Sequence, residues 1–136
     1  MDTDAVVAAM RSPAGASAAI IRAVRLKRAT LLLSVPLAME YEAVCGRPEH
    51  RLAAGLSCRQ VETYVDAIVA MAEPVQTHFL WRPQLRDPND EMVLEAAVNG
   101  GADALVTFNV RDYGAAAARF GVEVLLPREA ITRIER

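Results

Sequence analysis

The sequence predicts an α/β fold: a three-layer α/β/α sandwich in which helices cover both faces of a mostly parallel central sheet. Three observations lead to this expectation. Short apolar runs alternate along the chain with longer segments whose apolar residues recur at helical spacing. Residues that start or stop helices separate these segments. Strands that alternate with helices are typical of a parallel sheet buried on both faces.

Length and composition point to one folded domain. The 136 residues are enough for a single core, so we expect one domain over residues 1–136. No apolar run approaches the roughly 20 residues of a membrane helix, and no signal-peptide pattern opens the sequence, so we expect a cytoplasmic protein. Because the net charge is −2, any contact with nucleic acid needs a local basic patch.

The first half of the chain predicts three helices and one buried strand. Residues 16–28 repeat apolar positions at helical spacing, and residues 30–35 form a nearly continuous apolar run, as in a strand buried on both faces. Pro36 suits the first turn of a helix that ends near Gly46. An S-x-x-Q capping box then starts a helix over residues 57–72.

The second half continues the alternation. We expect a strand around Val75 to Leu80, followed by a helix that begins at the capping residues 87–90 and stops at Gly100-Gly101. The remaining expected elements are a strand at 104–107, a helix at 112–119, a strand at 122–126 and a helix at 127–134.

Oxygen-bearing side chains follow several of these strands or open the next helix. In a parallel sheet the carboxyl ends of the strands form the edge where ligands bind, so these side chains are expected to converge. Carboxylates held close together repel one another unless they are protonated or share a cation. Mg²⁺ or Mn²⁺ prefers such oxygen ligands and supports cleavage of phosphodiesters. The candidates are Asp2, Asp4, Glu40, Asp87, Asp90, Asn109 and Asp112.

Simpler interpretations stay open for single residues. Asp87, Asp90 and Asp112 are each suited to capping a helix, and Glu40 to the surface of one. Arg22 and Arg25 could bind RNA or form the solvated face of an amphipathic helix. Helix capping alone does not require the preceding strands to end at one sheet edge, which favours the metal interpretation for the set. The chain has no P-loop and no dinucleotide-binding glycine motif.

Four short segments each contain acidic residues in a recognisable setting. The single D-T-D is weak, but its combination with R-D-P-N-D and V-T-F-N-x-x-D, in this order, is specific. Together they resemble the PIN domain family, and within it the bacterial group described as toxin components of toxin-antitoxin systems. The segments span nearly the whole chain: Asp2 to Val7, Met39 to Pro48, Leu85 to Glu91, and Val106 to Tyr113.

This resemblance implies a metal-dependent ribonuclease that forms a homodimer and is blocked by a cognate antitoxin protein. Asp2 and Asp90 would ligate Mg²⁺ or Mn²⁺, and Glu40 would hold a metal-bound water. Asn109 or Asp112 would stand where the family has its fourth acid. Thr3 and Thr107 would support the site as hydrogen-bond donors, and Asp4 would be a further supporting residue. Asp87 would cap a helix whose amino-terminal end faces the anionic substrate.

Two departures from the family pattern affect the site. The family normally has a full strand before its first aspartate, whereas only Met1 precedes Asp2 here, so we expect a shortened first strand. Either translation starts further upstream, or Asp4 to Ala8 take part in the sheet. Asn109 stands where many relatives carry aspartate, which removes one negative charge, and Asp112 could supply that charge instead.

Two other functions compete with the nuclease. A catalytically weak PIN-like protein would still dimerise and bind antitoxin or RNA without efficient cleavage. A phosphoryl-accepting receiver domain also sets acids at the ends of parallel strands. Receiver chemistry calls for a lysine near a late strand, and because the only lysine, Lys27, lies in an early expected helix, this function is disfavoured.

Overall fold

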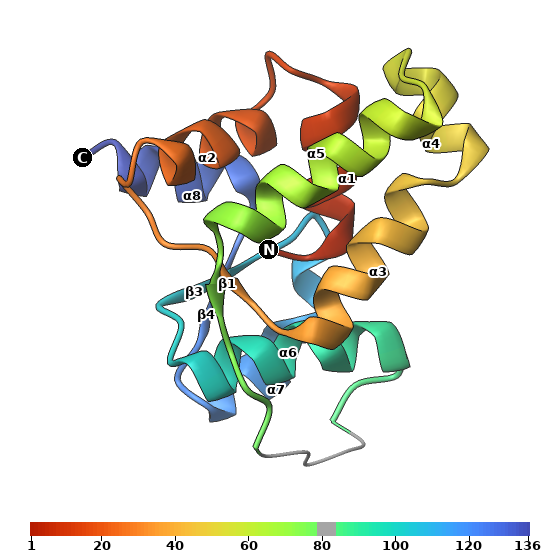
Figure 1. Ribbon diagram of the computed structural model, residues 1–136. Helices are drawn as coiled ribbons and strands as arrows, with labels where there is room; N and C mark the ends of the chain where they lie inside the picture. The colour runs from red at the N-terminus through yellow and green to blue at the C-terminus, as the bar shows by residue number, and fades with distance from the viewer. Residues whose placement is uncertain (79–83) are drawn as a thin grey trace.

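The computed structural model describes residues 1–78 and 84–136. Helices form most of this part of the chain and lie on both sides of short parallel strands (Figure 1). None of its helices has the length and apolar character needed to cross a bilayer. In chain order the elements are α1 (Thr3–Arg11), α2 (Ala16–Arg25), β1 (Leu32–Leu33), α3 (Val35–Cys45), α4 (Pro48–Ala54), α5 (Cys58–Met71), β2 (Glu73–Pro74), α6 (Pro88–Gly100), β3 (Ala104–Val106), α7 (Val110–Arg119), β4 (Glu123–Leu125) and α8 (Pro127–Ile134).

The helices that the sequence predicts are present, and α1 and α4 are additional. Ser57 caps α5 through the expected capping box with Gln60. Helix α1 corrects one expectation, because Asp4 to Ala8 are helical and take no part in a sheet. The Asp2 side chain accepts a hydrogen bond from the Thr3 N–H and so caps this helix, which buries one face against α2 and α3.

The strands are shorter than the apolar runs that predict them. The run at 30–35 yields only the two residues of β1, because the Ser34 side chain caps α3 and Val35 is already helical. The prediction of a strand at Val75 to Leu80 is wrong for residues 75–78, the part of this range that the structure describes. The observed β2 is Glu73–Pro74, and the His78 N–H bonds the Asn99 side chain instead of a strand; the end of the expected strand, residues 79–80, lies outside the described residues.

Both strand pairs are parallel, as expected, but within the described residues they do not join into one central sheet. β1 pairs with β2, and β3 pairs with β4. The hydrophobic core also has two parts, a large cluster with residues from α1, α3, α5, α6 and α7 and a small one with residues from α1, α2, β3, β4 and α8. Met1 alone among the described residues packs against both clusters. The molecule is therefore an α/β protein whose sheet is split beside Met1.

Candidate active site

Asp2 lies at the start of α1, beside the carboxyl end of β3. Its N–H donates to the Val106 carbonyl at 2.8 Å, which fixes the backbone beside the end of β3. Its carboxylate accepts hydrogen bonds from the Thr3 N–H and the Thr107 hydroxyl, both at 2.7 Å, and is buried. Such hydrogen bonds hold the side chain in one orientation. The Asp2 carboxylate is thus held by its neighbour Thr3 and by Thr107, which is distant in the sequence.

Thr107 connects the first residues of the chain to the loop after β3. Its side chain is fully buried, and its hydroxyl donates to Asp2 and accepts from the Asn109 N–H at 3.0 Å. Asp4 extends this connection, because its Oδ2 accepts from the Phe108 N–H at 3.1 Å and from the Asn109 side-chain amide at 3.0 Å. Asp4 therefore braces the β3–α7 loop, and its other oxygen, Oδ1, is buried without a hydrogen-bond partner.

Asp90 approaches from the opposite side, in the first turn of α6. Its Oδ1 accepts a hydrogen bond at 3.0 Å from the hydroxyl of Tyr113, a fully buried residue of α7. Burial raises the pKa of Tyr113 far above its usual range, and the charges of Asp2 and Asp90 raise it further. The phenol therefore stays protonated and lies close to both carboxylates.

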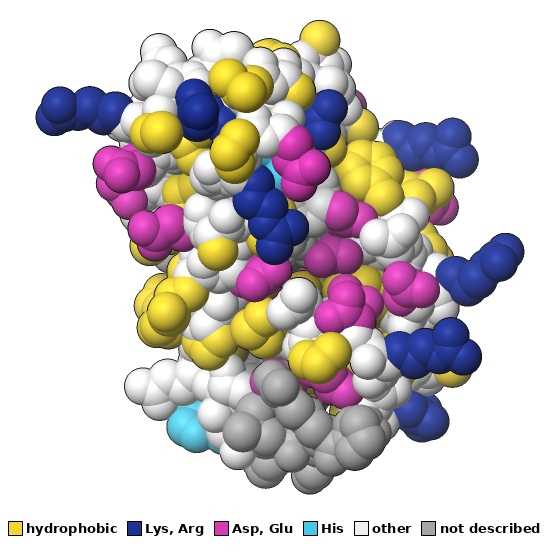
Figure 2. Space-filling model, turned by 90° about the vertical axis from the view of Figure 1, so that its right-hand side faces the viewer, with side chains coloured by type: hydrophobic (Ala, Val, Ile, Leu, Met, Phe, Trp, Pro, Cys, Tyr) yellow, Lys and Arg dark blue, Asp and Glu magenta, His cyan; other side chains and the backbone are white. Residues whose placement is uncertain are grey.

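Negative charge is concentrated around these groups. Burial raises the pKa of Asp90 to about 6, the Tyr113 hydrogen bond lowers it, and the nearby charges of Asp2, Asp87 and Asp112 raise it. Burial and the charge of Asp2 likewise raise the pKa of Asp4 to about 6. Figure 2 shows Asp and Glu side chains gathered across the middle of one face, with Lys and Arg mostly toward its edges.

The other candidates are placed less centrally. Asp87 is the exposed N-cap of α6, bonded to the Asn89 N–H, and Asp112 is exposed in the first turn of α7. Both lie within electrostatic range of Asp90. Asn109 gives its amide to Asp4, and Glu40 is half-buried on α3. Asp112 is thus better placed than Asn109 to add charge beside Asp90.

The donor chemistry fits a hard divalent cation, although the cluster is loose. Carboxylate oxygens are the ligands that Mg²⁺ and Mn²⁺ take, and Mg²⁺ is often held by one or two carboxylates with water and substrate phosphate completing its shell. Asp2 and Asp90 are the two carboxylates that would provide that pair. Across residues 1–78 and 84–136, however, no three acidic, His or Cys side chains come close enough to hold an ion together.

Arg22 and Arg25 lie at a distance from Asp90 and Asp112. Both are on α2, which packs against α1 and α8, whereas Asp90 and Asp112 belong to α6 and α7 at the other end of the molecule in Figure 1. The Arg22 guanidinium donates to the Pro13 carbonyl at 2.8 Å. Arg25 is exposed and free to meet solvent or a ligand outside the acidic group.

Two residues with clear structural roles escaped the sequence analysis. Tyr113 lies within one of the quoted segments, but nothing in the sequence indicates that its hydroxyl points at Asp90. Glu91 is buried and accepts hydrogen bonds from the N–H groups of Gln84 and Leu85, the latter at 2.7 Å. It therefore ties down the chain that leads into α6. From the sequence alone, an acidic residue next to Asp90 is expected to lie on the surface, so the buried role of Glu91 becomes visible only in the fold.

The raised pKa values of Asp4 and Asp90 predict how stability depends on pH without metal. Both carboxyls have an ordinary pKa of 3.8 and a folded pKa of about 6, so the folded state holds more protons between these values. Their stabilising effect is complete below pH 3.8 and is lost as pH rises through 6. In EDTA we expect the melting temperature to be several degrees lower at pH 7.5 than at pH 5.

The Asp4→Asn/Asp90→Asn double variant isolates this contribution. Because its two amides do not titrate, its melting temperature should change less between the two pH values than that of the original chain. An equal change in both proteins would contradict the assignment to these two carboxyls.

Comparison with known proteins identifies the family. A family search matches the PIN domain over residues 1–111, which includes Asp2, Asp90 and Thr107 but stops before Asp112 and Tyr113. No curated protein and no solved structure matches significantly. PIN domains are generally nucleases and typically use divalent metal ions. Because the match covers most of the chain, this protein belongs to the PIN domain family.

Proposed function

We propose that this protein is a Mg²⁺- or Mn²⁺-dependent endoribonuclease that cuts single-stranded RNA as the toxin of a toxin-antitoxin pair. One observation carries the nuclease proposal. Asp2 and Asp90, which are far apart in sequence, interact electrostatically, and each is held by a hydroxyl donor, Thr107 for Asp2 and Tyr113 for Asp90. Repelling carboxylates kept in fixed orientations are suited to share a cation.

The proposal gives each residue a distinct task. Asp2 and Asp90 would hold the cation, which supplies positive charge to offset the charge that develops on the phosphodiester. Thr107 and Tyr113 orient the two carboxylates. Asp112, which is exposed, adds negative charge near Asp90, and Glu40 would position water. Asp87 caps the neighbouring amino-terminal end of α6, where the helix dipole favours binding of a phosphate.

RNA, the antitoxin and a second copy of the chain are the proposed partners. The net charge of −2 means that RNA must be held by local cations, and Arg22 and Arg25 on α2 are the candidates. Phosphate contacts of this kind position a strand without reading its sequence.

A second candidate function rests on the looseness of the acidic group. Because no three ligand side chains gather among the described residues, the chain could bind RNA or an antitoxin while cleaving poorly. A cation bound by too few carboxylates would have low affinity. The two candidates differ in whether the protein as given cuts RNA when the metal is saturating.

Cleavage of a mixed single-stranded RNA by the purified protein tests the proposal. We expect cutting in Mn²⁺ or Mg²⁺ that stops in EDTA and returns when the metal is restored. Gel-resolved products report cleavage, and circular dichroism confirms that the protein stays folded without metal. A folded protein that retards RNA in a gel but leaves it intact at saturating Mn²⁺ would favour the binding function.

Replacing Tyr113 with phenylalanine tests the orientation of Asp90. The ring remains and only the hydroxyl that bonds Asp90 is lost. Because that bond lowers the pKa of Asp90, its removal raises this pKa, so the acidic limb of the pH–rate profile should move to higher pH. We expect a loss of about tenfold in cleavage at pH 6 and a smaller loss at pH 8.

Tyr64→Phe is the matched control for this variant. Its hydroxyl donates to the Val6 carbonyl, on the backbone of α1. The control also loses a partly buried tyrosine hydroxyl but should keep the original pH profile. An unshifted profile in Tyr113→Phe would refute the orienting role.

A further inference from the structure

Phe108 is an exposed aromatic side chain next to the candidate active site. It is 50 % exposed, whereas the other Phe and Tyr residues that the structure describes are buried or pack against the large core cluster. Phe108 directly follows Thr107, whose hydroxyl donates to the Asp2 carboxylate. The ring therefore belongs to the loop that supports one of the two proposed metal ligands.

Hydrogen bonds fix the backbone on both sides of this ring. The Phe108 N–H donates to Asp4 Oδ2 at 3.1 Å, and the Asn109 side-chain amide donates to the same oxygen at 3.0 Å. The Asn109 N–H donates to the Thr107 hydroxyl at 3.0 Å. Single exposed apolar side chains are common on protein surfaces and need no function. A ring on a fixed backbone, however, loses little conformational freedom when a ligand packs on it, which favours binding.

The charges around the site favour an uncharged contact with RNA. Asp90 has three further aspartates within electrostatic range, and Lys and Arg lie mostly toward the edges of the face in Figure 2. The proposed cation would offset this charge only at the phosphate that it binds, so the acids repel the rest of the RNA backbone. A base stacked on an aromatic ring adds affinity without charge, and proteins commonly hold single strands in this way.

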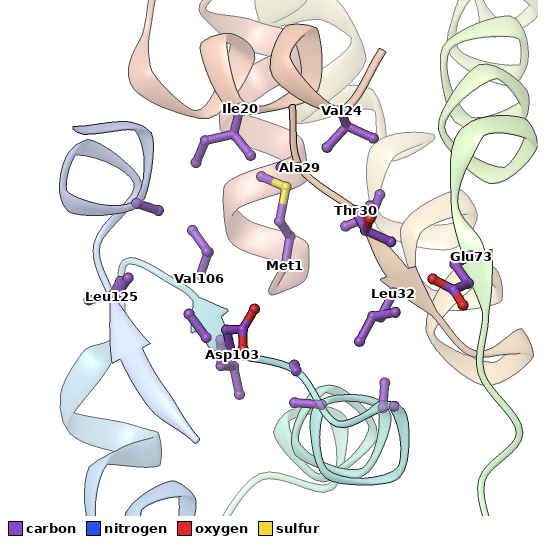
Figure 3. Close-up of a pocket in the computed structure, with 18 of the residues that line it drawn as sticks. Met1, Ile20, Val24, Ala29, Thr30, Leu32, Glu73, Asp103, Val106 and Leu125 are labelled. Carbon is purple, nitrogen blue, oxygen red and sulfur yellow. The ribbon is translucent and has the colours of Figure 1, made fainter. Parts of the chain in front are cut away.

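A cavity of about 620 Å³ elsewhere in the molecule is a poorer place for a base. Figure 3 shows it around Met1, with Val106 and Leu125 on one side and Leu32 on the other. Apolar side chains form most of its walls, which include neither Phe108 nor any of the aspartates proposed for the site. A base bound there would not lie beside the acids, so the exposed ring is the better candidate.

We propose that Phe108 is a stacking platform for one unpaired base of the RNA, next to the phosphodiester that the metal site would cut. This inference rests on the proposed nuclease function and adds a contact with a part of the substrate that the acids do not bind. In a duplex the faces of a base are covered by its neighbours, whereas an unpaired base can lay one face on the ring. Because every base has such a face, the platform would select unpaired regions with little preference among the four bases.

Short RNAs that carry the fluorescent base 2-aminopurine at one position test the platform, because stacking quenches this base. Binding is measured in Ca²⁺, which takes carboxylate oxygens in a looser geometry than Mg²⁺, and a gel checks that the RNA stays intact. We expect quenching at one position of the single strand and little in the duplex formed with a complementary strand.

Phe108→Leu keeps an apolar side chain but removes the flat ring, and Phe108→Tyr keeps the ring. We expect Phe108→Leu to lose the quenching and to bind the single strand about tenfold more weakly, and Phe108→Tyr to behave like the original chain. The loss should be the same at low and high salt, since stacking releases no counterions. In Mn²⁺, Phe108→Leu should raise KM for cleavage about tenfold and change kcat little. Leu52→Ala, which removes exposed apolar surface from α4, is the control and should change none of these values.

The outcomes separate the platform from the nuclease. Equal quenching and affinity in Phe108→Leu and the original chain would overturn the platform even if the protein cuts RNA. Quenching that depends on Phe108 in a protein that leaves RNA intact at saturating Mn²⁺ would support the platform and contradict the nuclease. An equal loss of affinity for single strand and duplex would overturn the platform, because the ring would then not contact an unpaired base. A protein that binds no RNA would overturn both.

Discussion

Asp90→Asn is expected to reduce metal-dependent RNA cleavage by about 100-fold or more while leaving the protein folded. Asparagine keeps the size of the side chain and an oxygen that can accept from Tyr113, so the change removes the charge and little else. Because Asp90 and Asp2 are the proposed cation ligands, the apparent affinity for Mn²⁺ should fall together with the rate. The measurements are initial rates across a Mn²⁺ titration and direct binding of Mn²⁺ by calorimetry.

Stability separates this loss from unfolding. Burial raises the pKa of Asp90 and nearby like charges raise it further, so removing its charge should leave the melting temperature in EDTA unchanged or higher at pH 7.5. Asp66→Asn is the control, since Asp66 is an exposed acid on α5. It removes the same net charge from another part of the surface. Asp90→Asn that cuts RNA and binds Mn²⁺ like this control would rule out Asp90 as a ligand.

The helices are the part of the fold that the sequence predicts best, because local chemistry fixes them. The Ser57–Gln60 capping box and the glycine stop at Gly101 lie where short-range rules expect them. Helix α1 was missed, although Asp2 caps it and its apolar residues cover one face. The sequence places Asp2 and Asp4 among the candidates for the metal site, whereas in the structure Asp2 also caps α1 and Asp4 also braces the β3–α7 loop.

Strand lengths were predicted poorly because they depend on partners. The apolar run at 30–35 is longer than β1, since Ser34 starts a helix before the strand can continue. Pro74 lies within β2 and has no N–H to give to a ladder, and the chain soon bonds to Asn99 instead. A strand with a free edge has few residues that pairing can hold, so the split sheet accounts for the short β1 and β3.

The candidate site shows a similar division between what the sequence predicts and what it does not. Its acids were found because their types and spacing match a metal-dependent family. The geometry of these acids does not follow from the sequence, because it depends on contacts between residues more than 20 positions apart. The Tyr113–Asp90 bond spans 23 residues and the Thr107–Asp2 bond spans 105. Asn109 was weighed as a fourth ligand on its position alone, and its amide is engaged with Asp4.

Thr107→Val is expected to lower both stability and cleavage, because this fully buried hydroxyl has three hydrogen-bond partners, Asp2, Asp4 and the Asn109 N–H. Valine has nearly the same shape but neither donates to Asp2 nor accepts from the Asn109 N–H. Leaving such partners unpaired costs about 1–3 kcal/mol, which urea unfolding would resolve. The freed Asp2 carboxylate should reduce the rate about tenfold beyond what lower stability explains.

Thr107→Ser separates the hydroxyl from the methyl group. Serine keeps the donor to Asp2 and leaves a small void, so it should lose some stability to packing but retain most of its cleavage rate. If instead Thr107→Val cleaved RNA at the original rate and Thr107→Ser did not, the methyl group of Thr107, and not its hydroxyl, would be the group that supports cleavage. Asp2 would then be oriented by its hydrogen bond with the Thr3 N–H and by the backbone bond to Val106, both of which either substitution leaves in place.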